Sequence, residues 1–270
     1  MRATVVRRTA LAACAVSLTL LATACGGSSD SDAEGGKGGR AGNAAEGGSS
    51  ASKTSAKALS AAELETASLK QGDVAGHKVA KAGPDDEVPA DGIKVDKEAC
   101  LPVAHAMYGV AQEGSVATTK RKVITEPKAG GKKSLKDMTE GEAEDALTAA
   151  FDLTSTFVAL NSYDGTAGPD AFAALKKAAA DCAGGFTATV AGEPTKIASV
   201  TEEKVTGGDE SAAWTVTSQD DGNQAPFKLA ALREEGTVAT FFAFNLAAAG
   251  GGAKFTVPTE VVAAQAKKLG

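Results

Sequence analysis

The sequence is poor in histidine, aromatic residues and cysteine. Phenylalanine, tryptophan and tyrosine make up 4% of the 270 residues, and the two histidines are His77 and His105. An active site or metal site built on several imidazole groups is therefore excluded. The sequence also has neither a Gly-x-Ser-x-Gly motif nor a Gly-rich loop followed by Lys and Ser or Thr, so it lacks a nucleophile elbow and a phosphate loop.

The sequence has no apolar run as long as the roughly 20 residues that a membrane-spanning helix needs. The run from Ala10 to Ala24 follows three arginines and no acidic residue, which is typical of a cleavable signal peptide. It leads into Leu21-Ala-Thr-Ala-Cys25, which resembles a bacterial lipobox. We therefore predict a lipoprotein signal peptide over 1–24 and acylation of Cys25. The alternative is an ordinary secreted protein in which Cys25 is a spare thiol.

Residues 25–57 contain no aromatic residue and no isoleucine, leucine or valine. Such a segment cannot bury enough apolar surface to offset its chain entropy, so we predict a flexible, disordered linker. A linker of this length has a typical reach of about 30 Å. We predict that it joins a lipid anchor at Cys25, on the extracytoplasmic face of a bacterial cell membrane, to a folded domain over 58–270.

The mature chain is acidic. Without the three arginines of residues 1–24, 25 basic and 34 acidic residues remain, and the net charge is −9. This charge argues against nucleic acid as a partner and against a polybasic membrane patch. The one basic cluster, Lys120-Arg121-Lys122 with Lys128, Lys132 and Lys133, is interpreted as a strand edge and a solvated loop.

Two of the four cysteines remain once Cys14 leaves with the signal peptide and Cys25 takes the lipid. In an oxidising compartment we expect Cys100 and Cys182 to form a disulfide. Closing a loop of about 80 residues would stabilise the fold by about 4 kcal/mol in the chain-entropy model. A metal site or a catalytic thiol remains the alternative for this pair.

Hydrophobic periodicity over 58–270 predicts both helices and strands, with strands in the majority. The expected helices are 60–71, 96–110, 168–182 and 258–269. The expected strands are 77–80, 115–125, 151–163, 186–190, 196–205, 212–218, 227–233 and 237–246. Residues 82–96 and 126–139 are expected to form loops. The prediction is an α+β domain in which helices pack on one face of an antiparallel sheet and a disulfide joins two of them.

The second half of this domain resembles a known family, the PknH-like extracellular sensor domain. The residues that carry the resemblance are Phe157, Ser162-Tyr163, Phe172-x-x-Leu175, Cys182-Ala183, Gly208-Asp209, Trp214, Leu232-Arg233 and Gly236-Thr-Val238. The resemblance implies a strongly curved antiparallel sheet backed by helices, with a cleft for a ligand. Kinase sensor domains of this family usually carry two disulfides, whereas this chain has the cysteines for one. It also has no kinase domain, so a signalling role would require a membrane signalling protein as partner.

The titratable residues do not form a recognisable catalytic set. A zinc site at Cys100 and His105 would need a free thiolate and two further ligands. The acidic pairs Asp85-Asp86, Glu142/Glu144 and Asp220-Asp221 are interpreted as solvated turn charges. We therefore predict no catalytic residue, no metal and no cofactor.

Three functions remain as hypotheses. The first is a non-catalytic ligand-binding or sensor lipoprotein, with a small-molecule or envelope ligand between the concave sheet face and the loops 82–96 and 126–140. The second is a cell-envelope scaffold that binds a protein partner without a small ligand. The third is an envelope hydrolase. A concave, mostly apolar cleft of several hundred Å³ would distinguish the first from the second.

Overall fold

The computed structural model describes residues 56–126, 139–249 and 254–270. These residues belong to one unit, Ser52–Gly270. The signal peptide over 1–24, the lipidation at Cys25, most of the linker over 25–57 and most of the loop 126–140 lie outside the described residues. They remain predictions from the sequence.

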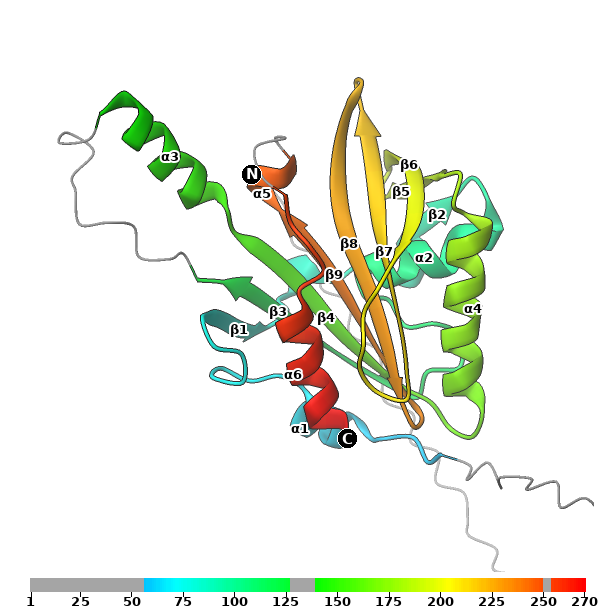
Figure 1. The fold of residues 1–270 in the computed structure, drawn as a ribbon. Coiled ribbons are helices and arrows are strands. Elements are labelled where there is room, and N and C mark those ends of the chain that lie inside the picture. The colour runs from blue at the N-terminus through cyan, green and yellow to red at the C-terminus, as the bar shows by residue number, and fades with distance from the viewer. Residues whose placement is uncertain (1–55, 127–138, 250–253) are drawn as a thin grey trace, which may run out of the picture. The chain divides into compact units, whose positions relative to one another are not determined.

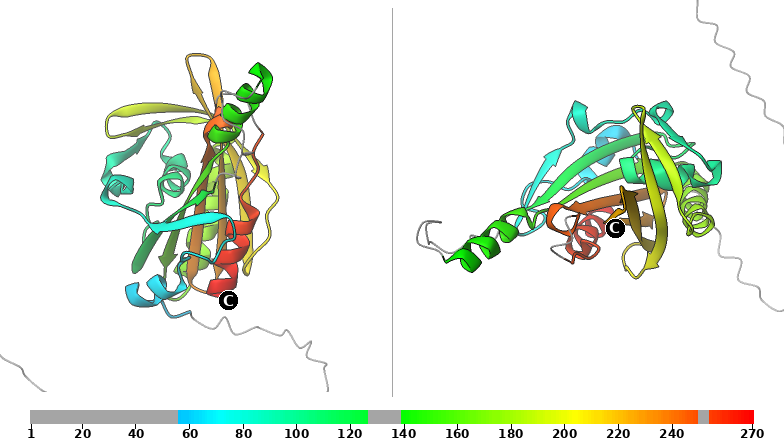
Figure 2. Two further views of the ribbon diagram at one scale, coloured as in Figure 1. Left: turned by 90° about the vertical axis from the view of Figure 1, so that its left-hand side faces the viewer. Right: turned by 90° about the horizontal axis from the view of Figure 1, so that it is seen from above.

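The described residues form a single open antiparallel sheet of nine strands in the order β1-β3-β4-β9-β8-β7-β6-β5-β2 (Figure 1). The sheet is strongly curved, as the two further views show (Figure 2). The strands are β1 His77–Lys81, β2 Ile93–Val95, β3 Ala117–Thr125, β4 Thr154–Ser162, β5 Phe186–Val190, β6 Glu193–Glu203, β7 Glu210–Asp220, β8 Asn223–Glu234 and β9 Thr237–Asn245. The predicted α+β class with a curved antiparallel sheet is confirmed.

The five strands from β5 to β9 follow one another as neighbours, because short turns reverse the chain between them. Asp221 and Gly222 take positive φ angles of 44° and 84° between β7 and β8. Glu235 has a φ of 47° at the turn between β8 and β9, where the sequence is Glu234-Glu235-Gly236. Left-handed residues in two-residue turns match the twist of the flanking strands.

Six α-helices and three short 3₁₀ turns complete the described structure. The helices are α1 Ala61–Ala67, α2 Leu101–Tyr108, α3 Glu140–Phe151, α4 Ala167–Asp181, α5 Leu246–Ala249 and α6 Thr259–Leu269. The 3₁₀ turns are η1 Pro84–Asp86, η2 Ala90–Gly92 and η3 Glu98–Cys100. Helices α1, α2, α4 and α6 were predicted, and β2 lies inside a segment that was predicted to be a loop.

Helix α3 was not predicted, and the expectation that Glu142 and Glu144 lie in a turn is wrong. The helix begins after Thr139, whose hydroxyl accepts a hydrogen bond from the Glu142 backbone N–H at 3.4 Å. The Glu142 carboxylate accepts in return from the Thr139 backbone N–H at 3.0 Å. This is a capping box, and its Thr-x-x-Glu signature was present in the sequence.

The expectation that helices pack on one face of the sheet is wrong in that they pack on both. Helices α2 and α4 share one apolar cluster with Trp214 and Leu229. Helices α1 and α6 share a second cluster with Leu160 and Phe241. Successive strand residues point to opposite faces, and the central strands are apolar at consecutive positions, so both faces need a cover.

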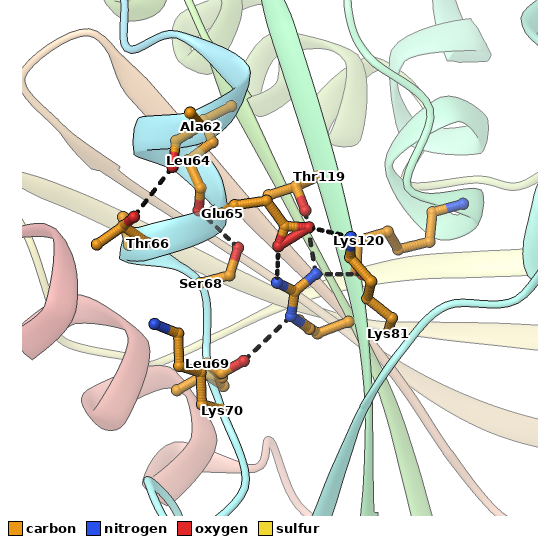
Figure 3. A network of polar contacts seen from close by, with 12 residues as sticks. Ala62, Leu64, Glu65, Thr66, Ser68, Leu69, Lys70, Lys81, Thr119 and Lys120 are labelled. Atoms are coloured by element: carbon orange, nitrogen blue, oxygen red, sulfur yellow. Dashed lines mark hydrogen bonds and ion pairs between the residues drawn. The ribbon is translucent and has the colours of Figure 1, made fainter.

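Arg121 of β3 holds the N-terminal segment through contacts with Leu69 and Glu65, which are labelled in Figure 3. Its guanidinium donates hydrogen bonds to the Leu69 carbonyl and the Thr119 hydroxyl, both at 3.1 Å, and to Glu65 of α1. Glu65 also pairs with Lys81 at 2.6 Å. Arg121 is buried, and β3 lies between β1 and β4, so the interpretation of Lys120-Arg121-Lys122 as a strand edge is wrong. Lys128, Lys132 and Lys133 of the predicted solvated loop lie outside the described residues.

Cys100 and Cys182 form the predicted disulfide, with their Cα atoms 5.8 Å apart. Cys100 ends η3 immediately before α2, and Cys182 follows α4 directly. The bond therefore joins the two helices that cover one face of the sheet. Because both thiols are used, the alternative of a metal or catalytic thiol at Cys100 is excluded in this structure.

Candidate functional site

A cleft of about 440 Å³ opens on the sheet face that α2 covers. Its floor is aromatic, because β4, β8 and β9 each turn phenylalanine side chains toward it. Helix α2 contributes one side, and the segment between β1 and β2 contributes the rim. The lining residues are Asp85, Asp86, Val88, Met107, Tyr108, Phe157, Thr195, Phe227, Phe242 and Phe244.

Strand register brings the four phenyl rings together. Phe242 and Phe244 are two residues apart on β9 and therefore point to the same face. Phe157 of β4 lies opposite Phe242, and its ring stacks against Phe244 with centroids 6.4 Å apart. The ring of Phe227, from β8, lies 5.3 Å from that of Phe242. All four rings remain half-buried, so part of this aromatic floor is open to a ligand.

The rim is a short strap, Pro84–Val88, that two lysines of β3 hold in place. Lys122 donates to the Asp86 carboxylate at 2.9 Å. Lys120 donates to the Asp86 carbonyl and to the Glu87 carboxylate, both at 3.1 Å. The hydrogen bond from Lys122 and a second one from the Gly83 N–H hold the pKa of Asp86 below its ordinary value of 3.8. The strap is therefore fixed to the sheet by ion pairs at neutral pH.

Replacing Lys122 by methionine is expected to raise the pKa of Asp86 toward 3.8, because the largest cause of its lowering is removed. A carboxyl whose folded-state pKa is lowered stabilises the closed strap above pH 3.8, and this contribution is lost as the pH falls through the lowered pKa. An NMR titration of the Asp86 side chain measures the shift. Lys94→Met, at an exposed site on β2, is the control and should leave the pKa of Asp86 unchanged. An unchanged pKa in Lys122→Met would show that the ion pair does not hold the strap.

The sequence anticipated one side of this cleft. The predicted ligand position lay between the sheet and the loops 82–96 and 126–140, and Asp85, Asp86 and Val88 of the first loop do line the cleft. Residues 127–138 of the second loop lie outside the described residues. The sequence places the four phenylalanines in expected strands, and the signal that two of them share a face was the alternation of Phe242 and Phe244.

The candidate zinc residues do not form a metal site. Cys100 is consumed by the disulfide, and His105 lies on α2, where burial lowers its pKa. His77 lies on β1, with Nδ1 2.9 Å from the Ala75 carbonyl oxygen and Nε2 3.6 Å from the Glu260 carboxylate. In the part of the chain that the structure describes, no group of three or more His, Cys, Asp or Glu residues is placed to hold a metal ion.

A second depression lies beside α1 and α6, on the opposite sheet face. It has a volume of about 660 Å³ and is more open than the aromatic cleft. The lining residues are Leu59, Ala62, Glu63, Thr66, Ala67, Lys268 and Leu269. Its walls are short or flexible side chains of helix surfaces without aromatic rings, so the aromatic cleft is the better candidate binding site.

Comparison with protein families and with curated proteins gives no match. Among solved structures, the chain is similar to the extracellular domain of PknH from Mycobacterium tuberculosis. The identity is 13% and the TM-score 0.46, over 79% of this chain and 96% of that one. This is a weak similarity at the level of the fold, and no site or ligand is transferred from it. None of the described helices is long and apolar enough to cross a membrane.

Proposed function

We propose that the protein is a lipid-anchored extracytoplasmic module that binds a ligand in the aromatic cleft without transforming it. The observation that carries the proposal is the cleft itself, which combines about 440 Å³ of space with four half-buried phenyl rings and few polar groups. Binding sites for small ligands typically have this size and composition. The lipobox-like segment ending at Cys25 supports the location at the outer face of the cell membrane.

The composition of the cleft supports a binding role over the envelope hydrolase. The polar side chains among its described lining residues are Asp85, Asp86, Thr195 and Tyr108, and burial raises the pKa of the Tyr108 phenol above its ordinary value of 10.0. Asp86 is engaged by Lys122, and its pKa is lowered, which is unsuitable for a general acid at neutral pH. A hydrolase would need a perturbed acid or a nucleophile and base to converge in the cleft.

A specific observation favours the scaffold hypothesis as the second candidate. Phe151 at the end of α3 and Leu246 at the start of α5 are 53% and 54% exposed. Both helices adjoin the same end of the sheet, since Phe151 precedes β4 and Leu246 follows β9. Large apolar side chains that gather on a surface are typical of protein contacts.

Replacing Phe242 by alanine is expected to weaken binding of the neutral apolar dye Nile red about tenfold, because the variant loses an aromatic contact in the floor of the cleft. Fluorescence titration of the chain lacking residues 1–25 measures the affinity. Phe151→Ala removes an exposed phenyl group outside the cleft and should leave the affinity unchanged. Equal loss in both variants, or no binding by the unmodified chain, would contradict the proposal.

A further inference from the structure

The cleft contains one charged side chain that lacks a partner. Asp85 lines the rim, is exposed, and makes no hydrogen bond or ion pair with any described residue. Its neighbour Asp86 differs, because its carboxylate accepts from Lys122 at 2.9 Å and from the Gly83 N–H at 2.9 Å. Among the described lining residues, the Asp85 carboxylate is therefore the charge that no neighbouring residue neutralises, and a charged group of a bound ligand would interact with it.

The nearby cations are already neutralised. The side chain of Lys120 is 4% exposed and pairs with Glu87. Lys122 pairs with Asp86, as described above. An anionic ligand would have to break one of these pairs and leave a carboxylate of the strap without its partner. Because the Glu87 side chain is 57% exposed, such an exchange replaces one carboxylate partner of Lys120 by another and gains little net free energy.

The aromatic floor already accommodates an ammonium group. The Nζ atom of Lys122 lies 5.2 Å from the centroid of the Phe157 ring. The negative face of a phenyl ring attracts a cation at this distance, and the attraction grows when the cation is shielded from water. The rings of Phe227, Phe242 and Phe244 lie in the same cleft without a described cation over them.

We propose that the ligand of this cleft is a cationic amphiphile, in which an apolar body covers the phenyl floor and an ammonium-type group lies against Asp85. The inference rests on the proposed function and specifies the chemistry of its ligand. Charge complementarity carries it: the free charge of the lining is negative, its positive charges are paired, and its rings attract cations. A quaternary ammonium group suits such a site because it is weakly hydrated, so its transfer from water to an aromatic environment costs little free energy.

Three probes with the same decyl chain test the inference: decyltrimethylammonium, decanol and decanoate. Calorimetric titration of the chain lacking residues 1–25, at low salt and below the micellar concentration of each probe, gives three affinities. We expect decyltrimethylammonium to bind about tenfold more tightly than decanoate, with decanol between them. Asp85→Asn should reduce that preference about two- to fivefold. Asp91→Asn, an exposed carboxylate on η2 outside the cleft, is the matched control and should keep it.

The outcomes separate this inference from the proposed function. Equal affinities for the three probes, or tighter binding of decanoate, would overturn the cationic ligand and leave an apolar binding site. Two results together support both: Phe242→Ala binds all three probes more weakly, and Asp85→Asn, but not Asp91→Asn, shows a reduced preference for decyltrimethylammonium. Absence of binding by every probe would overturn the proposed function and this inference together.

Discussion

Replacing Cys100 and Cys182 together by alanine is expected to lower the free energy of unfolding by about 4 kcal/mol. The two residues are 82 apart in the sequence, and in the chain-entropy model a cross-link over such a loop restricts the unfolded chain by about this amount. Both side chains are 1% exposed, so the substitution also removes two packed sulfur atoms from the core. Urea unfolding, followed by tryptophan fluorescence, measures the change.

Reduction of the unmodified chain before unfolding is the control for this substitution. It removes the cross-link without changing the side chains, so it should reproduce most of the loss. Because the bond joins η3 and α2 to α4, and α2 supplies Met107 and Tyr108 to the cleft, reduction should also weaken Nile red binding. A loss below about 1 kcal/mol in both experiments would show that the helices pack independently of the bond.

Replacing Gly185 by alanine is expected to lower the free energy of unfolding by about 3 kcal/mol. Gly185 connects α4 to β5 with a φ of +82°, a conformation that residues with a side chain rarely adopt. A Cβ atom there would lie 2.2 Å from the Ile197 carbonyl oxygen and 2.7 Å from that of Ala198. These are backbone atoms of β6, so the strand itself would have to move.

The adjacent glycine provides a matched control. A Cβ atom at Gly184 would meet no heavy atom within 4 Å, and its φ lies outside the positive range. Gly184→Ala should therefore change the free energy of unfolding by less than about 1 kcal/mol. Urea unfolding of both variants under the same conditions tests the difference. Similar losses at the two positions would contradict the close packing of this connection against β6.

The strands could be predicted because their signals are local. In β9, alternating large side chains and a turn before Thr237 define the strand and its faces. The number of helix-covered faces could not be derived in the same way. Consecutive apolar residues such as Ala213 and Trp214 belong to different clusters, one on each face of the sheet. That both faces are covered follows only from the packing of helices that are distant in the sequence. Helix α3 was missed for another reason, since its capping signal at Thr139 stood beside a Gly- and Lys-rich segment.

The aromatic cleft could not be predicted because it exists only where the helices leave part of the sheet uncovered. The sequence places Phe157, Phe242 and Phe244 in strands, and core packing is the usual role of such residues. Whether a helix covers those rings or leaves them half-buried depends on where α2 ends. Helix α2 ends at Tyr108, and Gly109 terminates it with a φ of 63°, so part of the floor stays open beside the strap.

The ion pairs of the strap also depend on the tertiary structure. The sequence shows Lys120 and Lys122 two residues apart, which places them on one face of a strand. It does not show that Asp86 and Glu87, more than thirty residues earlier, cross that face. Basic clusters are usually solvated, and here the sheet register and the strap bury one lysine and engage both.

The most direct test of a ligand site in the aromatic cleft is an NMR titration of the chain lacking residues 1–25 with decanol. Decanol is uncharged and apolar, so it could bind either in the aromatic cleft or in the depression beside α1 and α6. We expect the ring resonances of Phe157, Phe227, Phe242 and Phe244 to shift together and to saturate with one dissociation constant. Resonances beside α1 and α6, such as those of Leu59 and Leu269, should stay unchanged. Shifts confined to Leu59 and Leu269, or rings that do not respond at saturating decanol, would contradict a ligand site in the aromatic cleft.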